Sequence, residues 1–318
     1  MKKTFYLLVI LGLTFIGCEN KDKIAEEVNM IALDLKVSRF DNVFANASAS
    51  DIPNLRIEYP YLFPAPDSVW IAKLQDSLQI ELRQEVKTEF ADFEKEKVDI
   101  ELLFKYIKYY FPKYQVPRVI TVTNDVDYNN RVILADSLLL IGLDNYLGPE
   151  HKYYSGLQNY IAKDMNRDFI VSNIASAFAN KVVSRPKERT FLAQIIYYGK
   201  ILYLKDKLMP FHTDRQKISY SQDQLDWAQA NEEPMWRHFI ENELLYSTDI
   251  KLSQRFLNPA PFSKFGLELD NESPGQLGRY LGWQIVRSFM DKNEVSLLQL
   301  LNLSAEDIFK KSNYKPNK

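Results

Sequence analysis

The residue types that most often carry out chemistry are scarce in this chain of 318 residues, which has three histidines, one cysteine and ten glycines. The histidines, His151, His212 and His238, do not form H-E-x-x-H, the motif in which two imidazoles one helical turn apart hold zinc. The sequence also has no G-x-S-x-G elbow, Walker A loop or G-x-G-x-x-G fingerprint. We therefore predict a protein without catalysis, bound metal or other cofactor. His151 and His212 are expected in exposed loops, and His238, on a helix that bears aromatic residues, is expected to be packed or hydrogen-bonded.

Carboxylates are the abundant acid–base groups, and three of them alternate at Glu268, Asp270 and Glu272, just before Ser273-Pro274. A pair such as Asp270 and Glu272 could bind a hard cation or act as acid and base. The alternative is structural, because negative charge near a helix N-terminus contributes about 0.3–1 kcal/mol. We favour the structural interpretation. A carboxylate- or metal-dependent hydrolase remains the alternative function.

The single cysteine ends a segment that is typical of an exported protein. Two lysines precede an apolar run that stops at Gly17-Cys18 and is too short to span a bilayer. We therefore predict a signal peptide over residues 1–17. A small residue before a cysteine at this boundary resembles a bacterial lipobox, so signal peptidase II would cut before Cys18 and the thiol would carry lipid. A plain signal peptide, or an anchor helix with a buried cysteine, is the alternative.

Several acyl chains hold a protein stably on a membrane. The lipobox therefore predicts a membrane-anchored envelope lipoprotein, periplasm-facing or associated with the outer membrane. Residues 18–28 would form a polar, lipidated tether, residues 29–312 a single domain and residues 313–318 a frayed C-terminal tail. The formal net charge of −2 and the pI of about 6.0 do not indicate a nucleic-acid partner.

Strand and helix patterns come first along the chain, with helices expected from residue 67 to about 93 and over residues 100–111, and mainly helical patterns follow. Residues 30–40 alternate between apolar and polar, and residues 117–123 and 131–134 are rich in β-branched side chains, which predicts strands. Residues 138–143 are expected to extend the last of these strands or to form a strand of their own.

From about residue 152 the pattern is helical almost to the end of the chain. Pro186 is expected in the first turn of a helix that ends at Leu208, and Ser273-Pro274 is expected to begin another. The order of elements predicts an α+β fold: a predominantly α-helical single domain with a small β-sheet.

Several segments, taken together, resemble one protein family. They are Ile141–Gly148, Tyr197–Tyr203, Asn258–Phe265, Asp270–Gly275, Gly282–Arg287 and Ile308–Ser312. With the lipobox, essentially the whole chain resembles GldB, the gliding-motility lipoprotein of Bacteroidota. The resemblance implies an envelope lipoprotein that is associated with surface gliding and type IX secretion and has no enzymatic activity. Its partners would be the membrane and other gliding or secretion envelope proteins.

A more distant likeness concerns the order of the helices, with Y-x-G in one and G-x-Y-x-G-x-x-I-V-R in a later one. This order is similar to zinc proteases that carry H-E-x-x-H. The corresponding region near residues 173–178 has no zinc ligand. The likeness implies a zincin-like fold whose zinc motif is absent, with a cleft between residues 131–147 and the 273–290 helix. The candidate interaction or cleft residues are Asp144, Tyr146, Tyr198, Asp270, Glu272, Arg279, Tyr280 and Trp283. A module that binds a ligand in this cleft is a third possibility.

Overall fold

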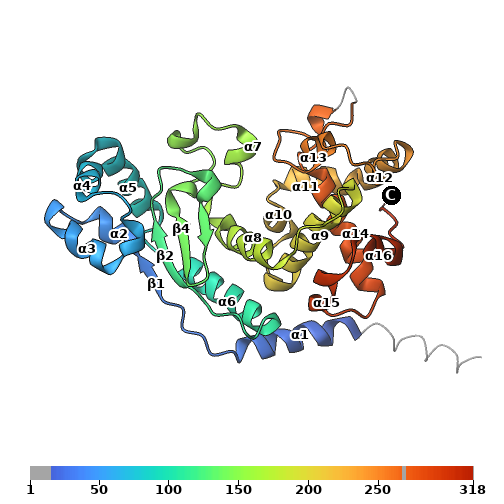
Figure 1. Ribbon diagram of the computed structural model, residues 1–318, viewed down its shortest axis with the longest axis horizontal. Coiled ribbons are helices and arrows are strands. Elements are labelled where there is room, and N and C mark those ends of the chain that lie inside the picture. Colours follow the sequence, from blue (N-terminus) through green and yellow to red (C-terminus); the bar gives the residue numbers. More distant parts are fainter. Residues whose placement is uncertain (1–15, 267–269, 318) are drawn as a thin grey trace, which may run out of the picture.

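A small mixed sheet lies in the middle of the molecule (Figure 1). The computed structural model describes residues 16–266 and 270–317. The strands are β1 (Val37–Arg39), β2 (Arg118–Val122), β3 (Val132–Leu134) and β4 (Leu138–Gly142), in the order β1-β2-β4-β3. Strands β1, β2 and β4 run parallel, and β3 is antiparallel to β4. Residues 138–143 thus contribute a strand of their own, and the predicted α+β fold with a small sheet is confirmed.

Helices cover both faces of the sheet. Successive side chains of a strand point to opposite faces, and apolar side chains on both faces are buried under helices. On one face Val119 and Leu139 belong to the main core, together with side chains of α6 (Glu94–Tyr110) and α8 (Ile170–Val182). On the other face Ile120 packs in a separate cluster with aromatic side chains such as Phe40 and Phe63. The helices around this second cluster are α2 (Phe40–Ala45), α3 (Ile52–Glu58), α4 (Asp67–Gln75) and α5 (Ser77–Glu89).

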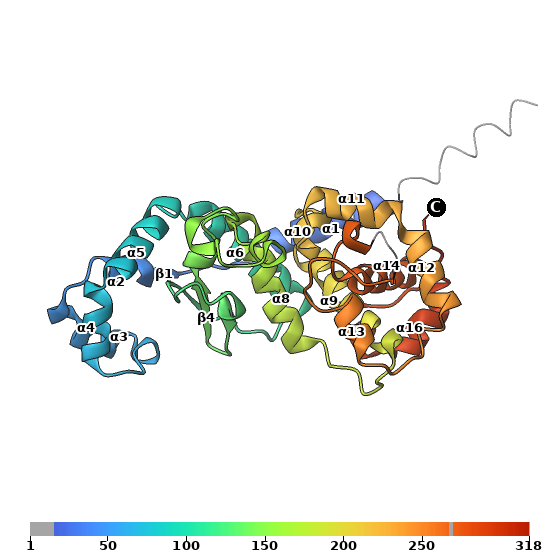
Figure 2. The same cartoon turned by 90° about the horizontal axis from the view of Figure 1, so that it is seen from above.

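The second half of the chain is a helical assembly beside the sheet (Figure 2). Its two longest helices, α9 (Phe191–Leu208) and α14 (Leu277–Lys292), pack against each other at its centre. Shorter helices complete it: α10 (Asp214–Ile218), α11 (Gln222–Ala230), α12 (Glu232–Glu241), α13 (Lys251–Phe256), α15 (Leu297–Asn302) and α16 (Ala305–Ser312). Helix α7 (Asn159–Ala162) lies on the side of the sheet (Figure 1), where Ala162 packs in a small cluster with Tyr154 and Met165.

Two glycines allow α9 and α14 to touch backbone to backbone. A Cβ atom added to Gly199 would lie 2.2 Å from the carbonyl oxygen of Gly282. A Cβ atom added to Gly282 would lie 1.9 Å from the carbonyl oxygen of Ile195. Both distances are far below van der Waals contact, so only glycine fits at this crossing.

The N-terminal segment differs from the prediction. Residues 18–28, which we expected to form a polar tether, belong to helix α1 (Ile16–Asn29), which packs against α6. The prediction failed because Ile24 and Val28 lie one turn apart, and both contact the main core; Val28 is fully buried. Residues 1–15 of the predicted signal peptide lie outside the described residues. The alternating pattern of residues 30–40 gives a strand only at Val37–Arg39.

Two helices begin later than predicted. Helix α9 starts at Phe191, after Thr190, whose hydroxyl accepts the N–H of Ala193, and Pro186 lies outside it. Helix α14 starts at Leu277 rather than at Ser273-Pro274. The Ser273 hydroxyl is used elsewhere, since it donates to backbone carbonyls and caps no helix.

The C-terminal tail is docked rather than frayed. The Tyr314 hydroxyl and the Asn317 backbone N–H donate to Oε1 of the buried Glu232, at 2.7 and 3.1 Å. This attachment could not be predicted from the sequence, because its acceptor on α12 lies more than 80 residues away along the chain.

Candidate functional site

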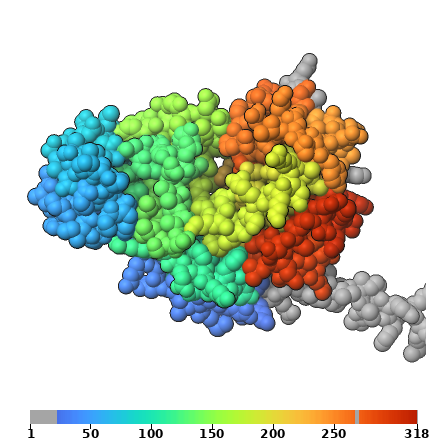
Figure 3. Space-filling view, viewed as in Figure 1, coloured from blue at the N-terminus to red at the C-terminus, as the bar shows by residue number. Residues whose placement is uncertain are grey.

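A cavity of about 680 Å³ lies between the sheet and the helical assembly. Its walls come from α8, α9, the start of α14 and the segments 128–132, 160–164 and 217–219, which include parts of β3, α7 and α10. Figure 3 shows the corresponding hollow between the green and the yellow-to-orange parts of the surface. Of the two segments expected to bound a cleft, residues 131–147 contribute Arg131 and Val132 to this wall, and α14 contributes Arg279.

Helices α8 and α9 each line the cavity with residues at positions i, i+3, i+4 and i+7, which share one face of a helix. From α8 these are Asn173, Ser176, Ala177 and Asn180, and from α9 they are Tyr198, Ile201, Leu202 and Lys205. The α8 stripe consists of small and polar side chains. These leave space where larger apolar residues would have closed the core.

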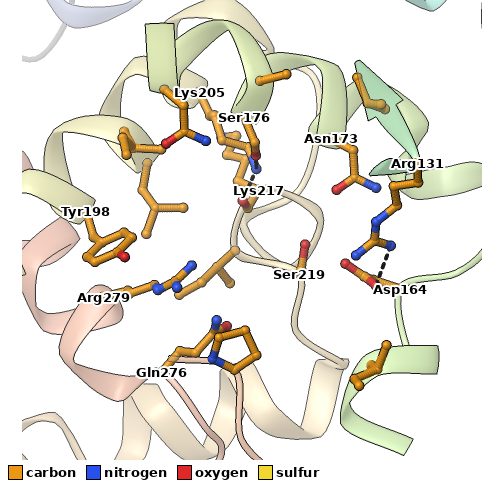
Figure 4. Close-up of a pocket in the computed structure, with 18 of the residues that line it drawn as sticks. Arg131, Asp164, Asn173, Ser176, Tyr198, Lys205, Lys217, Ser219, Gln276 and Arg279 are labelled. Carbon is orange, nitrogen blue, oxygen red and sulfur yellow. Dashed lines mark hydrogen bonds and ion pairs between the residues drawn. The ribbon is translucent and has the colours of Figure 1, made fainter. Parts of the chain in front are cut away.

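Two of the basic residues that line the cavity are neutralised by carboxylates. Arg131 Nη1 lies 2.8 Å from Asp164 Oδ1, the only acidic group that the described residues contribute to the wall (Figure 4). Lys217 Nζ lies 3.0 Å from Asp206 and 3.3 Å from Asp214, outside the wall.

The other three basic residues of the wall, Lys163, Lys205 and Arg279, have no carboxylate within ion-pair distance in the part of the chain that the structure describes. Their hydrogen-bond partners are neutral: Gln224 Oε1 at 2.9 Å, Ser176 Oγ at 3.0 Å and the Leu257 carbonyl at 2.6 Å, respectively. Lys205 also donates to the Lys217 carbonyl.

Burial lowers the pKa of all three of these basic groups. It lowers the pKa of Lys205 to about 7 and that of Lys163 to about 8, because charge is costly away from water. Lys205 is only 2% exposed. Burial also lowers the pKa of Arg279, which stays charged because a guanidinium is such a strong base.

Two residues of the wall have a left-handed backbone although they are not glycine. Ser219, after the end of α10, has φ 60°, and Gln276, before the start of α14, has φ 66°. Such conformations are uncommon outside glycine, and strained backbone tends to cluster at functional sites. Both residues are labelled beside the cavity in Figure 4.

Of the predicted cleft residues, Tyr198 and Arg279 line the cavity. The Arg279 guanidinium lies over the Tyr198 ring, 4.1 Å from its centroid. Tyr146 lies behind the wall, where its hydroxyl accepts from the Asn173 amide at 3.1 Å. Asp144 is fully buried and accepts backbone N–H groups of the 124–126 loop, and burial raises its pKa to about 6.

The remaining predicted residues lie away from the cavity. Asp270 accepts the backbone N–H groups of Phe265 and Gly266, and Glu272 is exposed, so these carboxylates are not brought together in the cavity. Glu268 lies outside the described residues. The Tyr280 hydroxyl donates to Glu232, and the Trp283 indole donates to Asp206.

None of the three histidines lines the cavity. His151 and His212 are half-buried rather than exposed. The His151 ring packs on the neighbouring Tyr153 and Tyr154. Burial lowers the pKa of His212. His238 packs against Phe265 at 5.1 Å between ring centroids, as predicted. Within residues 16–266 and 270–317, no group of three or more histidine, cysteine, aspartate or glutamate residues is placed to hold a metal ion.

Sequence reasoning missed the uncompensated lysines and the polar stripe of α8. The stripe carries a readable signal, since Asn173, Ser176 and Asn180 recur at helical spacing in an otherwise apolar segment. Lys205 offers a weaker one, as a charge on the apolar helix 191–208. Nothing in the sequence shows that Lys163 joins them.

A family model described as "Gliding motility protein GldB" matches residues 21–316. The searches of curated proteins and of solved structures give no match. The zincin-like similarity therefore stays a prediction.

Proposed function

Since this chain belongs to the GldB family of gliding motility proteins, we propose that it is a membrane-anchored envelope lipoprotein that acts by binding other proteins. On this proposal it supports gliding motility and type IX secretion without catalysis. The observation that carries the proposal is the family match over residues 21–316, which begins just after Cys18. In the described residues no helix has the length and hydropathy needed to cross a membrane.

The proposed anchor is lipid on Cys18, and its test is the variant Cys18→Ala. We expect this variant to leave the membrane fraction and to lose incorporation of labelled palmitate, because the acyl chains supply the attachment. Thr14→Ala is the matched control, because it alters the same apolar segment and keeps the cysteine. Unchanged membrane retention of Cys18→Ala would refute the anchor.

The proposed role is tested in cells that carry this chain. Deletion is expected to abolish gliding and the appearance of secreted adhesins, and crosslinking in intact cells is expected to recover other gliding or secretion proteins. Normal gliding and normal secretion in the deletion strain would contradict the role, whatever the fate of the anchor.

A carboxylate- or metal-dependent hydrolase is the competing function, with Asp270 as its central residue. Both Asp270 oxygens accept backbone N–H groups of its own loop, at 3.1 and 2.8 Å, which favours a structural role. A stoichiometric metal in the purified protein, together with a hydrolytic activity lost in Asp270→Asn, would support the competing function.

A further inference from the structure

We propose that the cavity between α8, α9 and α14 binds a small organic dianion, such as a phosphate monoester, with Lys205, Arg279 and Lys163 as its cationic contacts. This inference goes beyond the proposed function and does not depend on it, because it rests on the cavity alone.

The charge balance of the wall identifies the ligand as an anion. Asp164 neutralises Arg131, and Lys217 is neutralised by two carboxylates outside the wall. Lys163, Lys205 and Arg279 are left with neutral hydrogen-bond partners. Two or three uncompensated positive charges around one cavity match a dianion better than a monoanion.

The cost of these charges supports the same conclusion. A buried cation without a counter-ion is expensive, and proteins usually pair it. Here the three groups converge on one cavity instead of being dispersed or replaced by apolar residues. A bound anion would supply the missing counter-charge.

Arg279 has donors to offer such a ligand. Among its five N–H groups, the one on Nε donates to the Leu257 carbonyl, and no other hydrogen bond of its guanidinium is found in the part of the chain that is described. Figure 4 shows the guanidinium directed into the cavity beside Tyr198. Its position is set by the aromatic ring rather than by a carboxylate.

The size and lining of the cavity indicate that the anionic group belongs to an organic molecule. A volume of about 680 Å³ falls within the range of roughly 300–1,000 Å³ of small-molecule sites. Apolar and hydroxyl-bearing residues such as Tyr160, Ile201, Leu202 and Ser219 form other parts of the wall. A bare inorganic ion would leave this surface without a contact.

The test is a calorimetric titration of the full chain in detergent at pH 7, with glycerol 3-phosphate, inorganic phosphate and acetate as probes. The main variant is Lys205→Met, which removes the charge and keeps a side chain of similar length. Lys200→Met is a matched control, since Lys200 is also a buried lysine of α9, donates to the Leu301 and Leu303 carbonyls and does not line the cavity. Burial lowers the pKa of Lys200 to about 8, so both variants remove a similar desolvated charge.

We expect saturable one-to-one binding of glycerol 3-phosphate with a Kd of about 1 mM or tighter, with phosphate weaker and acetate weakest. Lys205→Met should weaken this binding at least tenfold, and Lys200→Met should change it less than twofold. Arg279→Gln gives a second reading if Lys205→Met does not fold, and should also lose at least tenfold. Absence of saturable binding by both phosphates, unchanged affinity in the cavity variants, or an equal loss in Lys200→Met would overturn the proposal.

Discussion

Replacing Gly282 by alanine tests whether the contact between α9 and α14 is as close as the structure shows. The added Cβ would lie 1.9 Å from the Ile195 carbonyl oxygen, so the helices must separate by about 1.1 Å to reach 3.0 Å, below which real Cβ contacts essentially never occur. Overpacking of this kind costs about 1–3 kcal/mol, and the upper end applies because backbone atoms cannot rotate away. Alanine regains about 1 kcal/mol of helix propensity. The net loss is about 2 kcal/mol.

Thermal unfolding followed by circular dichroism measures this loss. With about 2–4 °C per kcal/mol for a large domain, Gly282→Ala should lower Tm by about 4–8 °C. Gly199→Ala should behave similarly, and the double variant should lose less than the sum, because one separation relieves both clashes. Gly156→Ala is the control, since no atom lies within 4 Å of its added Cβ. A Gly282→Ala protein as stable as the wild type would refute the close crossing.

Three further predictions concern charged groups. The pKa of Lys205 is about 7 in the folded state and near 10.5 in the unfolded state, so the unfolded state binds more protons between these values. Wild-type stability should therefore rise relative to Lys205→Met between pH 7 and 9 in urea unfolding, and a pH-independent difference would contradict the shift. Glu232→Ala should speed hydrogen exchange of residues 313–317, because Tyr314 and its neighbours lose their acceptor; unchanged exchange would show that the tail is held otherwise. Arg287→Leu should lower the free energy of unfolding by about 2–3 kcal/mol in the same assay, because Asp206 loses a bidentate partner. This loss is smaller than that expected for a fully buried ion pair. A loss below about 0.5 kcal/mol, the scale of a surface substitution, would argue against the network.

The fold class was predictable because it depends on local periodicity. The β-branched runs predicted β2 and β3 nearly at their observed bounds, and the helical pattern after about residue 152 predicted the helical second half of the chain. Helix starts were less predictable. A serine followed by proline looked like the beginning of a helix, but the Ser273 hydroxyl bonds to the carbonyls of Ser263 and Asp270 instead. The Ser273 hydroxyl, which local sequence rules assign to a helix cap, is therefore engaged by contacts that the sequence pattern does not show.

The cavity was predictable only in part, because local sequence patterns do not show which distant residues come together. Tyr198 and Arg279 were predicted because they lie in the two helical segments that resemble zinc proteases, and the structure places the Arg279 guanidinium over the Tyr198 ring. The carboxylates near residue 270 looked chemically active because they are close in sequence, yet Asp270 is used within its own loop. Lys163 and Lys205 are 42 positions apart in the sequence, and only the folded structure shows that they line the same cavity. Single charged residues that are far apart in the sequence form no periodic pattern, so their meeting at one cavity cannot be predicted from the sequence.

The glycine crossing and the cavity are physically coupled. Tyr198 is adjacent to Gly199, and Arg279 lies one helical turn before Gly282, so the contact that excludes a Cβ atom also fixes the guanidinium over the ring. No carboxylate is needed to hold Arg279 in place, and its charge stays available to a ligand. Gly282→Ala should therefore weaken glycerol 3-phosphate binding as well as stability. Arg287→Leu loses stability through a network that reaches the wall only at Lys217. This variant should therefore retain more of the binding than Gly282→Ala at an equal loss of stability. If both variants lose binding in proportion to stability, the position of Arg279 does not depend on the crossing.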